Sequence, residues 1–193
     1  MITTSTAGKL DTDELLHLAW AAGDKGETDR AIALLKQAAE EAPNDARCHY
    51  LLGAEYAQIG MYERAIAQMQ AAIELDPELH AARFQLGLLQ LTSRDADAAQ
   101  ATWAPLEMLG PRHAFTLFKT GLAHLAKDEF AACVQCLQQG IAANDFNAPL
   151  NTDMQRILAQ VEPLAQQQPA EAKAESGAGV DHLFINAYTR RLN

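Results

Sequence analysis

Cysteine and long apolar runs are scarce in this sequence. Only three cysteines occur among 193 residues, an odd and sparse set that does not suggest a disulfide framework. No apolar run approaches the length of a membrane span, which excludes a membrane-spanning helix from the expected fold. The first ten residues contain neither an apolar core of secretory length nor a basic leader. These absences predict a cytoplasmic protein without a membrane span.

Basic and aromatic residues are also few. Fifteen Lys and Arg stand against 25 Asp and Glu, for a formal charge of −10. A nucleic-acid partner requires clustered basic side chains, so this balance argues against one. Aromatic residues make up only 6% of a chain that is 49% hydrophobic and rich in alanine. That composition favours helices packed through small residues over a β-sandwich.

Motifs that carry catalytic chemistry are missing. The sequence has no Gly-rich phosphate loop, no nucleophile elbow and no HExxH-type helix, and its six histidines lack metal-type spacing. Cys133 and Cys136 alone have redox or metal spacing, which leaves a thiol or metal protein as an alternative. Cys133, however, lies within an expected helix, where a buried structural cysteine is the usual case. We therefore expect no enzyme, no cofactor and no metal.

A regular repeat organises most of the chain. Pro43, Pro77 and Pro111 are evenly spaced, and each follows a segment of the same pattern. The clearest copy spans residues 46–79 and contains His49-x₂-Leu52-Gly53-x₂-Tyr56, then Ala65-x₃-Met69, then Pro77. This order of small, large apolar, aromatic and proline residues resembles the tetratricopeptide repeat, a helix–turn–helix unit of about 34 residues, and the spacing of the prolines is the same as that period.

The resemblance implies an all-α fold, a tetratricopeptide-type α-solenoid with four helix–turn–helix repeats. We expect these repeats at residues 12–45, 46–79, 80–113 and 114–147. Asp11 and Glu14 form a capping-box pattern at the start of the first repeat. Pro105 falls within the second helix of the third repeat, so we expect that helix to kink or end near Trp103. The fourth repeat has Asp145 where the closing proline would stand.

The repeats are flanked by segments of different composition. Residues 1–10 are expected to be a disordered lead. Residues 151–162 carry apolar side chains at helical spacing, which predicts a helix that caps the repeats. Residues 163–179 are rich in Ala, Gln, Gly and Pro and predict a flexible linker. Residues 180–193 then return to an amphipathic helical pattern, with Val180, Leu183, Phe184, Ala187 and Tyr188 on one stripe.

A second apolar stripe on the first helix of each repeat is the candidate site. By resemblance to the family, these offsets line the concave groove in which peptides dock. The candidate groove residues are Leu16, Trp20, Tyr50, Phe84, Leu88, Leu91, Phe115, Phe118, Leu122 and Leu125. So many exposed apolar side chains would form a patch larger than monomers usually carry, so a ligand should cover them. The alternative is that tighter packing buries most of them as ordinary core.

The chemistry of this stripe restricts the ligand. Tetratricopeptide proteins that hold a carboxylate use Lys, Asn and Arg in the groove, whereas the corresponding positions here include Leu16, Trp20 and Leu51. The predicted function is a non-enzymatic adaptor that binds a hydrophobic helical or extended segment of a protein or peptide. A bacterial secretion-type chaperone that shields an apolar client is the alternative. The ligand could also be the tail itself, docking through Leu183, Phe184 and Tyr188 onto its own repeats or, as a homodimer, onto those of a second copy.

Overall fold

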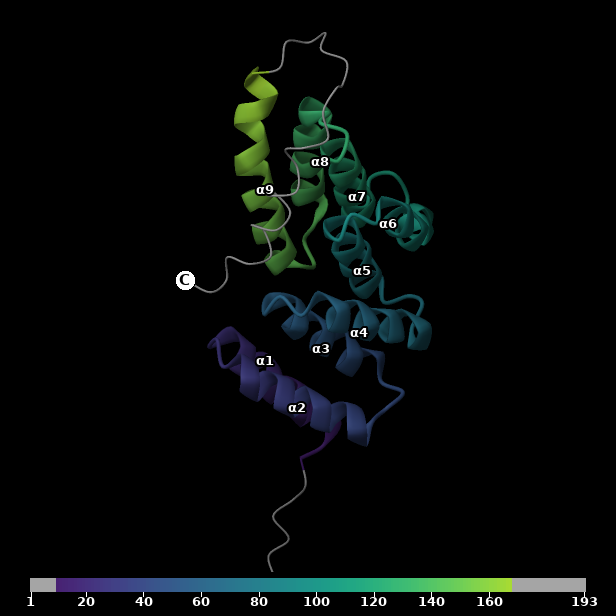
Figure 1. The fold of residues 1–193 in the computed structure, drawn as a ribbon, viewed down its shortest axis with the longest axis vertical. Helices are drawn as coiled ribbons and strands as arrows, with labels where there is room; N and C mark the ends of the chain where they lie inside the picture. The colour runs from purple at the N-terminus through teal and green to yellow at the C-terminus, as the bar shows by residue number, and fades with distance from the viewer. Residues whose placement is uncertain (1–9, 168–193) are drawn as a thin grey trace, which may run out of the picture. The chain divides into compact units, whose positions relative to one another are not determined.

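The protein is helical throughout the part of the chain described by this computed structural model, residues 10–167. Figure 1 shows the helices following one another in consecutive pairs. Their bounds are α1 (Thr12–Asp24), α2 (Thr28–Glu41), α3 (Ala46–Gln58), α4 (Tyr62–Leu75), α5 (His80–Thr92), α6 (Ala96–Trp103), the 3₁₀ helix η1 (Ala104–Leu109), α7 (Ala114–Leu125), α8 (Phe130–Ala143) and α9 (Ala148–Gln167). The expected all-α class is thereby confirmed. Within these residues, no helix is both long and apolar enough to cross a membrane.

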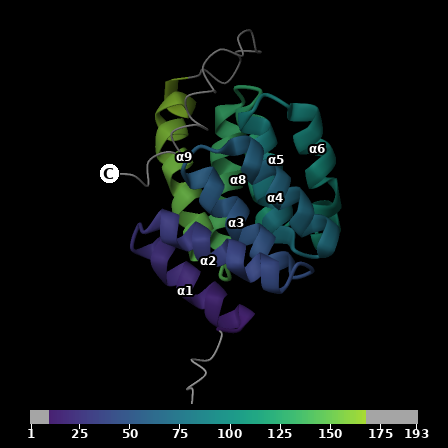
Figure 2. The same cartoon turned by 60° about the horizontal axis from the view of Figure 1, so that its bottom comes forward.

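The chain divides into two compact units, with the boundary between Ala82 and Arg83. In the first unit, α1 packs against α2, α2 against α3, and α3 against α4 (Figure 2). In the second unit, α7 packs against α8, and α8 also packs against α9. Within each unit, helices therefore contact their neighbours in sequence, which is the arrangement expected for stacked helix–turn–helix repeats.

The turn within each repeat depends on one residue with a left-handed backbone. Gly26 and Gly60 have φ values of 75° and 74°, and the residues one and two periods further on, Arg94 and Asp128, have φ values of 65° and 56°. A left-handed conformation is easy for glycine and costs other L-residues roughly 1–2 kcal/mol. The fold therefore imposes the same turn on repeats three and four without the glycine that favours it.

The first helix of the first repeat begins at the capping box predicted from the sequence. The backbone N–H of Glu14 donates to Asp11 Oδ1 at 2.8 Å, and the backbone N–H of Asp11 donates to Glu14 Oε2 at 2.9 Å. Asp45 caps α3, and His113 caps α7, each by accepting from a backbone N–H of the first turn. These caps satisfy donors that the helix itself leaves unpaired.

A close contact between one small and one large residue joins the two helices of a repeat. A Cβ placed on Gly53 would lie 3.1 Å from Met69 Cγ, and one on Gly121 would lie 3.0 Å from Leu137 Cδ2. A Cβ on Gly87 would overlap the indole ring of Trp103. Met69, Trp103 and Leu137 are almost completely buried. Glycine on the first helix therefore makes room for a large buried side chain of the second.

Aromatic rings form the centre of the second unit. The indole N–H of Trp103 donates to the backbone carbonyl of Phe84 at 3.0 Å. The Phe84 ring lies 5.9 Å from the Trp103 ring, 5.5 Å from Phe115 and 6.1 Å from Phe118, centroid to centroid. Aromatic pairs at these separations contribute about 0.5–1.5 kcal/mol beyond their buried area. This cluster connects α5, α6 and α7.

The second helix of the third repeat ends early, as Pro105 predicts. Helix α6 stops at Trp103, and residues 104–109 continue as the 3₁₀ helix η1, with Pro105 in its first turn. Proline is acceptable there because the first N–H groups of a helix have no partner within it. Two contacts fasten η1 to α7: Lys119 Nζ donates to Glu107 Oε1 at 2.8 Å, and Thr116 Oγ1 donates to the Leu106 carbonyl at 3.0 Å.

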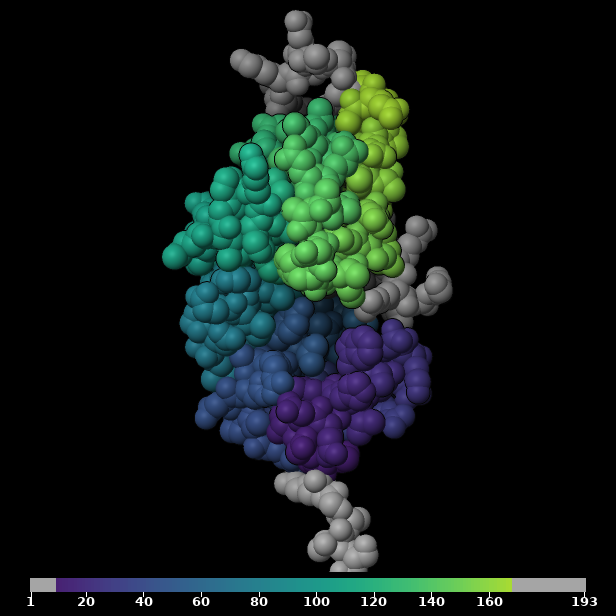
Figure 3. Space-filling model, turned by 180° about the vertical axis from the view of Figure 1, so that it is seen from behind, coloured from purple at the N-terminus to yellow at the C-terminus, as the bar shows by residue number. Residues whose placement is uncertain are grey.

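The last helix is longer than the sequence predicted. Helix α9 begins at Ala148 rather than 151 and ends at Gln167 rather than 162, with Pro163 inside it. Residues 163–167 are therefore helical rather than part of a linker. Leu164 is half-buried and continues the stripe that buries Val161, so packing offsets the cost of the proline. Figure 3 shows α8 and α9 side by side. Residues 1–9 of the expected lead at 1–10, the rest of the linker and the expected helix at 180–193 lie outside the described residues.

The tight contact at Gly87 predicts a large effect of one added methyl group. We expect Gly87→Ala to lower the free energy of unfolding by about 2–3 kcal/mol, because the indole must leave its place and its hydrogen bond to Phe84. Gly53→Ala is the matched control. A Cβ there would lie 3.1 Å from Met69 Cγ, 3.2 Å from the Ala65 carbonyl oxygen and 3.3 Å from Gln68 Cβ, which is tight but not an overlap. Alanine also gains up to about 1 kcal/mol in helix propensity, so we expect a clearly smaller loss than for Gly87→Ala. Urea denaturation followed by circular dichroism measures both, and equal losses would contradict the steric account.

Candidate protein-interaction surface

Most of the side chains predicted to line a groove lie in the protein interior. The buried members of the predicted set are Leu16, Phe84, Leu88, Phe115, Phe118, Leu122 and Leu125. Phe84, Phe115 and Phe118 belong to the aromatic cluster of the second unit. These seven side chains therefore do not form an open apolar surface, and the alternative of tighter packing holds for them.

These side chains are buried because the first helix of a repeat packs against more than one neighbouring helix. The apolar stripe on α7 packs on α8, and the rings of α7 also meet Phe84 on α5. On α1, Leu15 and Leu16 are both buried, whereas Leu18 is 36% exposed. Burying the large apolar side chains of the predicted groove stabilises the fold by roughly 1.5–3 kcal/mol for each of them.

Three members of the predicted set keep access to solvent. Trp20 on α1 is 63% exposed, and Tyr50 on α3 and Leu91 on α5 are partly exposed. Burial of its ring raises the pKa of Tyr50 above the usual value of 10.0, so its hydroxyl stays protonated at neutral pH. Trp20 is the most exposed of the three. A tryptophan that exposes most of its ring is a typical anchor for a partner protein.

A further exposed aromatic surface was missed by the sequence reasoning. Phe146, in the turn between α8 and α9, is 53% exposed. Its ring lies 5.5 Å from the ring of His113 and 5.4 Å from the ring of Phe115, centroid to centroid. Phe146 is the exposed ring of this group, His113 is half-buried and Phe115 is buried. We call these three residues the Phe146 patch. The available signal was a phenylalanine next to Asp145 in a polar turn, where the repeat pattern has its proline.

An asparagine network holds the turn that carries Phe146. The Asn144 side chain donates to the Asn147 carbonyl and to Asn151 Oδ1, both at 2.8 Å, and accepts from the Asn147 backbone N–H at 3.1 Å. Asn151 in turn donates to the Asn144 carbonyl at 2.9 Å. Asn144 is buried, so these bonds offset the cost of its desolvation. They fix the turn without the proline that ends the other repeats.

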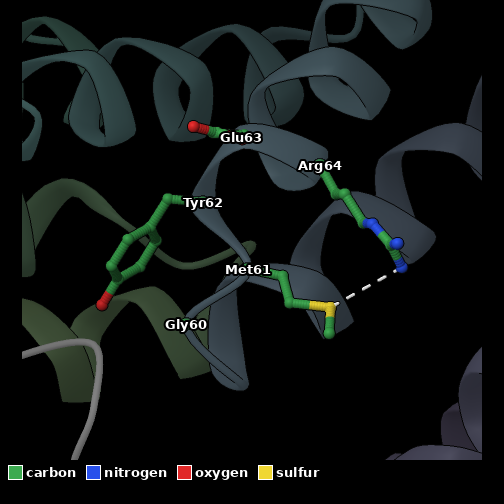
Figure 4. Close-up of a pocket in the computed structure, with 5 residues that line it drawn as sticks. All are labelled: Gly60, Met61, Tyr62, Glu63 and Arg64. Atoms are coloured by element: carbon green, nitrogen blue, oxygen red, sulfur yellow. Dashed lines mark hydrogen bonds between the residues drawn. The ribbon is translucent and has the colours of Figure 1, made fainter.

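A pocket of about 380 Å³ lies at the turn between α3 and α4. Figure 4 shows Tyr62 and Arg64 pointing away from each other across this turn. The Arg64 guanidinium lies 5.7 Å from the centre of the Tyr56 ring, and its Nη1 is 3.9 Å from Met61 Sδ. The lining residues Gly60, Met61, Tyr62, Glu63 and Arg64 come from one segment, and none belongs to the predicted groove. The pocket therefore does not identify a ligand.

Comparison with known proteins decides the family. The tetratricopeptide repeat family matches residues 16–80 and 55–104. Helix pairs that recur at the same period fill these ranges and continue to Ala143. The chain is a tetratricopeptide repeat protein. Such proteins mediate protein–protein interactions.

Relatives of this tetratricopeptide repeat protein are distant. The BBSome complex member BBS4 of Bos taurus is 26% identical over 148 residues, which cover 77% of this chain and 28% of that protein. The crystal structure of TTC0263, a thermophilic TPR protein of Thermus thermophilus, has a TM-score of 0.65 at 20% identity and covers 91% of this chain and 96% of its own. The crystal structure of YrrB, described as a TPR protein with an unusual peptide-binding site, has a TM-score of 0.55 at 15% identity, with coverage of 92% and 86%. At these identities the two structures show the fold.

The cysteines of the repeat protein are poorly placed for thiol or metal chemistry. Burial raises the pKa of the Cys133 thiol from its ordinary 9.0 to about 12, and burial also raises the pKa values of Cys48 and Cys136. The thiolate is the form that attacks electrophiles and binds metals, so a raised pKa disfavours both. Among residues 10–167, no three side chains of the metal-binding type are grouped as ligands. Cys133 occupies the small buried position that Ala31, Ala65 and Ala99 fill in the other repeats.

We expect Cys133 to be unreactive in the folded protein. At pH 8 a disulfide reagent should label it only after denaturation, since almost none of the buried thiol ionises far below a pKa of about 12. Stability should fall as the pH rises from about 9 towards 12, because the unfolded state loses this proton first. Cys133→Ala should keep the fold and remove that part of the alkaline loss. Rapid labelling of native Cys133 would contradict this.

Proposed function

We propose that this tetratricopeptide repeat protein is a non-enzymatic adaptor that binds a hydrophobic helical or extended segment of a partner protein. The observation that carries the proposal is the exposure of Trp20, which is 63% accessible on the first helix of the first repeat. An exposed tryptophan loses little conformational freedom on binding and offers a large apolar area.

The setting of Trp20 supports a binding role over a structural one. Leu16, one helical turn earlier, is buried, as are Leu15 and Ala19, so α1 is already anchored to its unit without the indole. Truncation of Trp20 should therefore leave the fold intact. The half-buried Tyr50 on α3 provides a second amphipathic side chain in the same unit. We propose that these two residues contribute to the partner surface.

Charge further restricts the proposed partner. The chain carries a formal charge of −10, and α1 has Asp13 and Glu14 in its first turn, of which Asp13 pairs with Arg47 at 2.8 Å, and no basic residue in its last turn. A partner segment with an apolar stripe and basic flanking residues would be steered towards such a surface, more strongly at low ionic strength. The apolar stripe would supply affinity, and the charges would mainly raise the association rate.

Three other observations support binding over catalysis and over the more specialised alternative. The raised thiol pKa values disfavour the thiol or metal interpretation of Cys133 and Cys136. A secretion-type chaperone would need a long apolar groove for its client, and seven of the ten predicted groove residues are buried. YrrB, which shares the fold, is described as having a peptide-binding site. An adaptor with a small number of exposed aromatic anchors fits these observations best.

The proposal predicts a selective effect of Trp20. Peptides selected from a random displayed library on the intact protein should be enriched in apolar residues. Trp20→Ala should weaken their binding by about 30-fold, the loss expected for a hot-spot residue worth about 2 kcal/mol. Fluorescence anisotropy of labelled peptides gives the dissociation constants.

Leu18→Ala is the matched control for this measurement. Leu18 lies on the same helix and is 36% exposed, but residues two apart on a helix face in different directions. Both variants should unfold within about 0.5 kcal/mol of the parent protein, since neither side chain is in the core. Peptides that bind Trp20→Ala as tightly as the parent, or that lack apolar anchors, would overturn the proposal.

A further inference from the structure

We propose that the C-terminal segment of this chain, residues 180–188, docks on the Phe146 patch of the same molecule. The patch lies in the second unit and Trp20 in the first, so this inference goes beyond the proposed adaptor function and does not depend on it. Four properties support it: the construction of the patch, the length of the intervening chain, the apolar pattern of the segment and its charge.

The exposed Phe146 ring of the patch is held in place by its neighbours, the half-buried His113 and the buried Phe115. The rings of His113 and Phe115 both lie within 5.5 Å of the Phe146 ring, and the patch continues inward to Phe84, 5.5 Å from Phe115. The asparagine network holds the turn beneath it. His113 is held as the N-cap of α7 by accepting from the Phe115 N–H at 3.3 Å. A ligand that docks here therefore meets a surface that is already ordered, which lowers the entropic cost of binding.

The length and direction of α9 place the segment within reach of the patch. Phe146 lies two residues before α9 begins, and the helix ends at Gln167. Twenty helical residues span about 30 Å at 1.5 Å per residue. The 12 residues from 168 to 179 can extend to about 40 Å at 3.3–3.6 Å per residue. The chain can therefore return along α9 and deliver residue 180 to the end of the helix at which Phe146 lies.

The segment has the side chains that an aromatic patch would bind. Leu183, Phe184 and Tyr188 share one stripe at helical spacing, and two of them are aromatic. Aromatic pairs favour offset or edge-on packing, which an exposed Phe146 ring can accept. Residues 180–193 also contain Arg190 and Arg191 against one acidic residue, Asp181, while the whole chain has a charge of −10. The apolar side chains of the segment and its net positive charge therefore both favour docking on the rest of this acidic chain.

Docking within one molecule is favoured over docking between two. A short tether gives an effective concentration of order 1 mM, which exceeds the concentration of a second copy in most solutions. With an intrinsic dissociation constant of about 0.1 mM, a tethered segment would be bound about ten times as often as it is free. A weak contact of this kind would be displaced by any partner that binds the patch more tightly.

Hydrogen exchange of the full chain tests this proposal. Amides in residues 180–188 should exchange about tenfold more slowly in the intact protein than in a synthetic peptide of residues 180–193. Phe146→Ala should remove this protection. Met108→Ala is the matched control, because Met108 is an apolar residue in the same unit, is 91% exposed and lies outside the patch. It should leave the protection unchanged, as should Trp20→Ala.

A substitution in the C-terminal segment tests the same contact without changing any residue of the repeats. Phe184→Ser should abolish protection of 180–188 and speed exchange at the amides of residues 144–150, which the docked segment would cover. The proposal is overturned if residues 180–188 of the intact protein exchange at the peptide's rate. Protection that survives Phe146→Ala would also overturn it. Protection that grows with protein concentration, together with a dimer mass in sedimentation, would overturn docking within one molecule and mean that a second copy supplies the segment. None of these outcomes changes the interpretation of the Trp20 experiment.

Discussion

The structure depends on one steric constraint, the close approach of two helices at a small residue. Ala19, Gly53, Gly87 and Gly121 recur at the repeat period on the first helices, and Leu35, Met69, Trp103 and Leu137 recur at the same period on the second. All four large side chains are essentially inaccessible to solvent. The size of the first residue sets how closely the helices approach, and the second residue fills the space that remains. In the third repeat this filling residue is Trp103, which stacks on Phe84 of α5, and Phe84 in turn contacts Phe115 and Phe118 of α7.

That aromatic core explains why the surface offers few apolar anchors. Once Trp103 and Phe84 are stacked, Phe115 and Phe118 find neighbours inside the protein. Among the described residues, the most exposed aromatic side chains are Trp20 in the first unit and Phe146 in the second, while Tyr50, Tyr62 and Phe130 are partly exposed. Each of the first two lies on a well-packed element, α1 or the turn before α9. A protein with a few rigid aromatic anchors can recognise short apolar segments without a continuous groove, because a few residues usually carry most of the binding energy.

The irregular parts of the repeats show how the fold compensates for a missing sequence signal. Arg94 and Asp128 adopt the left-handed turn conformation that Gly26 and Gly60 adopt without strain, because the helices on either side require it. Asn144, Asn147 and Asn151 replace the closing proline of the fourth repeat with hydrogen bonds. Pro105 divides the second helix of the third repeat into α6 and η1, and the Lys119–Glu107 ion pair fastens the second piece to α7. In each case tertiary contacts offset a local preference for another conformation.

The sequence by itself determined the helical class, the repeat period, the capping box at Asp11 and the early end of α6, because each follows from local geometry: helical spacing, a short-range hydrogen bond or a proline ring. It did not determine which apolar stripe faces solvent. Leu16 and Leu18 are two positions apart on α1, and only the packing of the neighbouring helices buries the first and exposes the second. The sequence offered Phe146 in a polar turn but did not determine the patch around it, because His113 and Phe146 are distant along the chain and meet only when α7, α8 and α9 pack. Local sequence patterns therefore determined the scaffold. The candidate sites depended on which side chains the packed helices leave exposed to solvent.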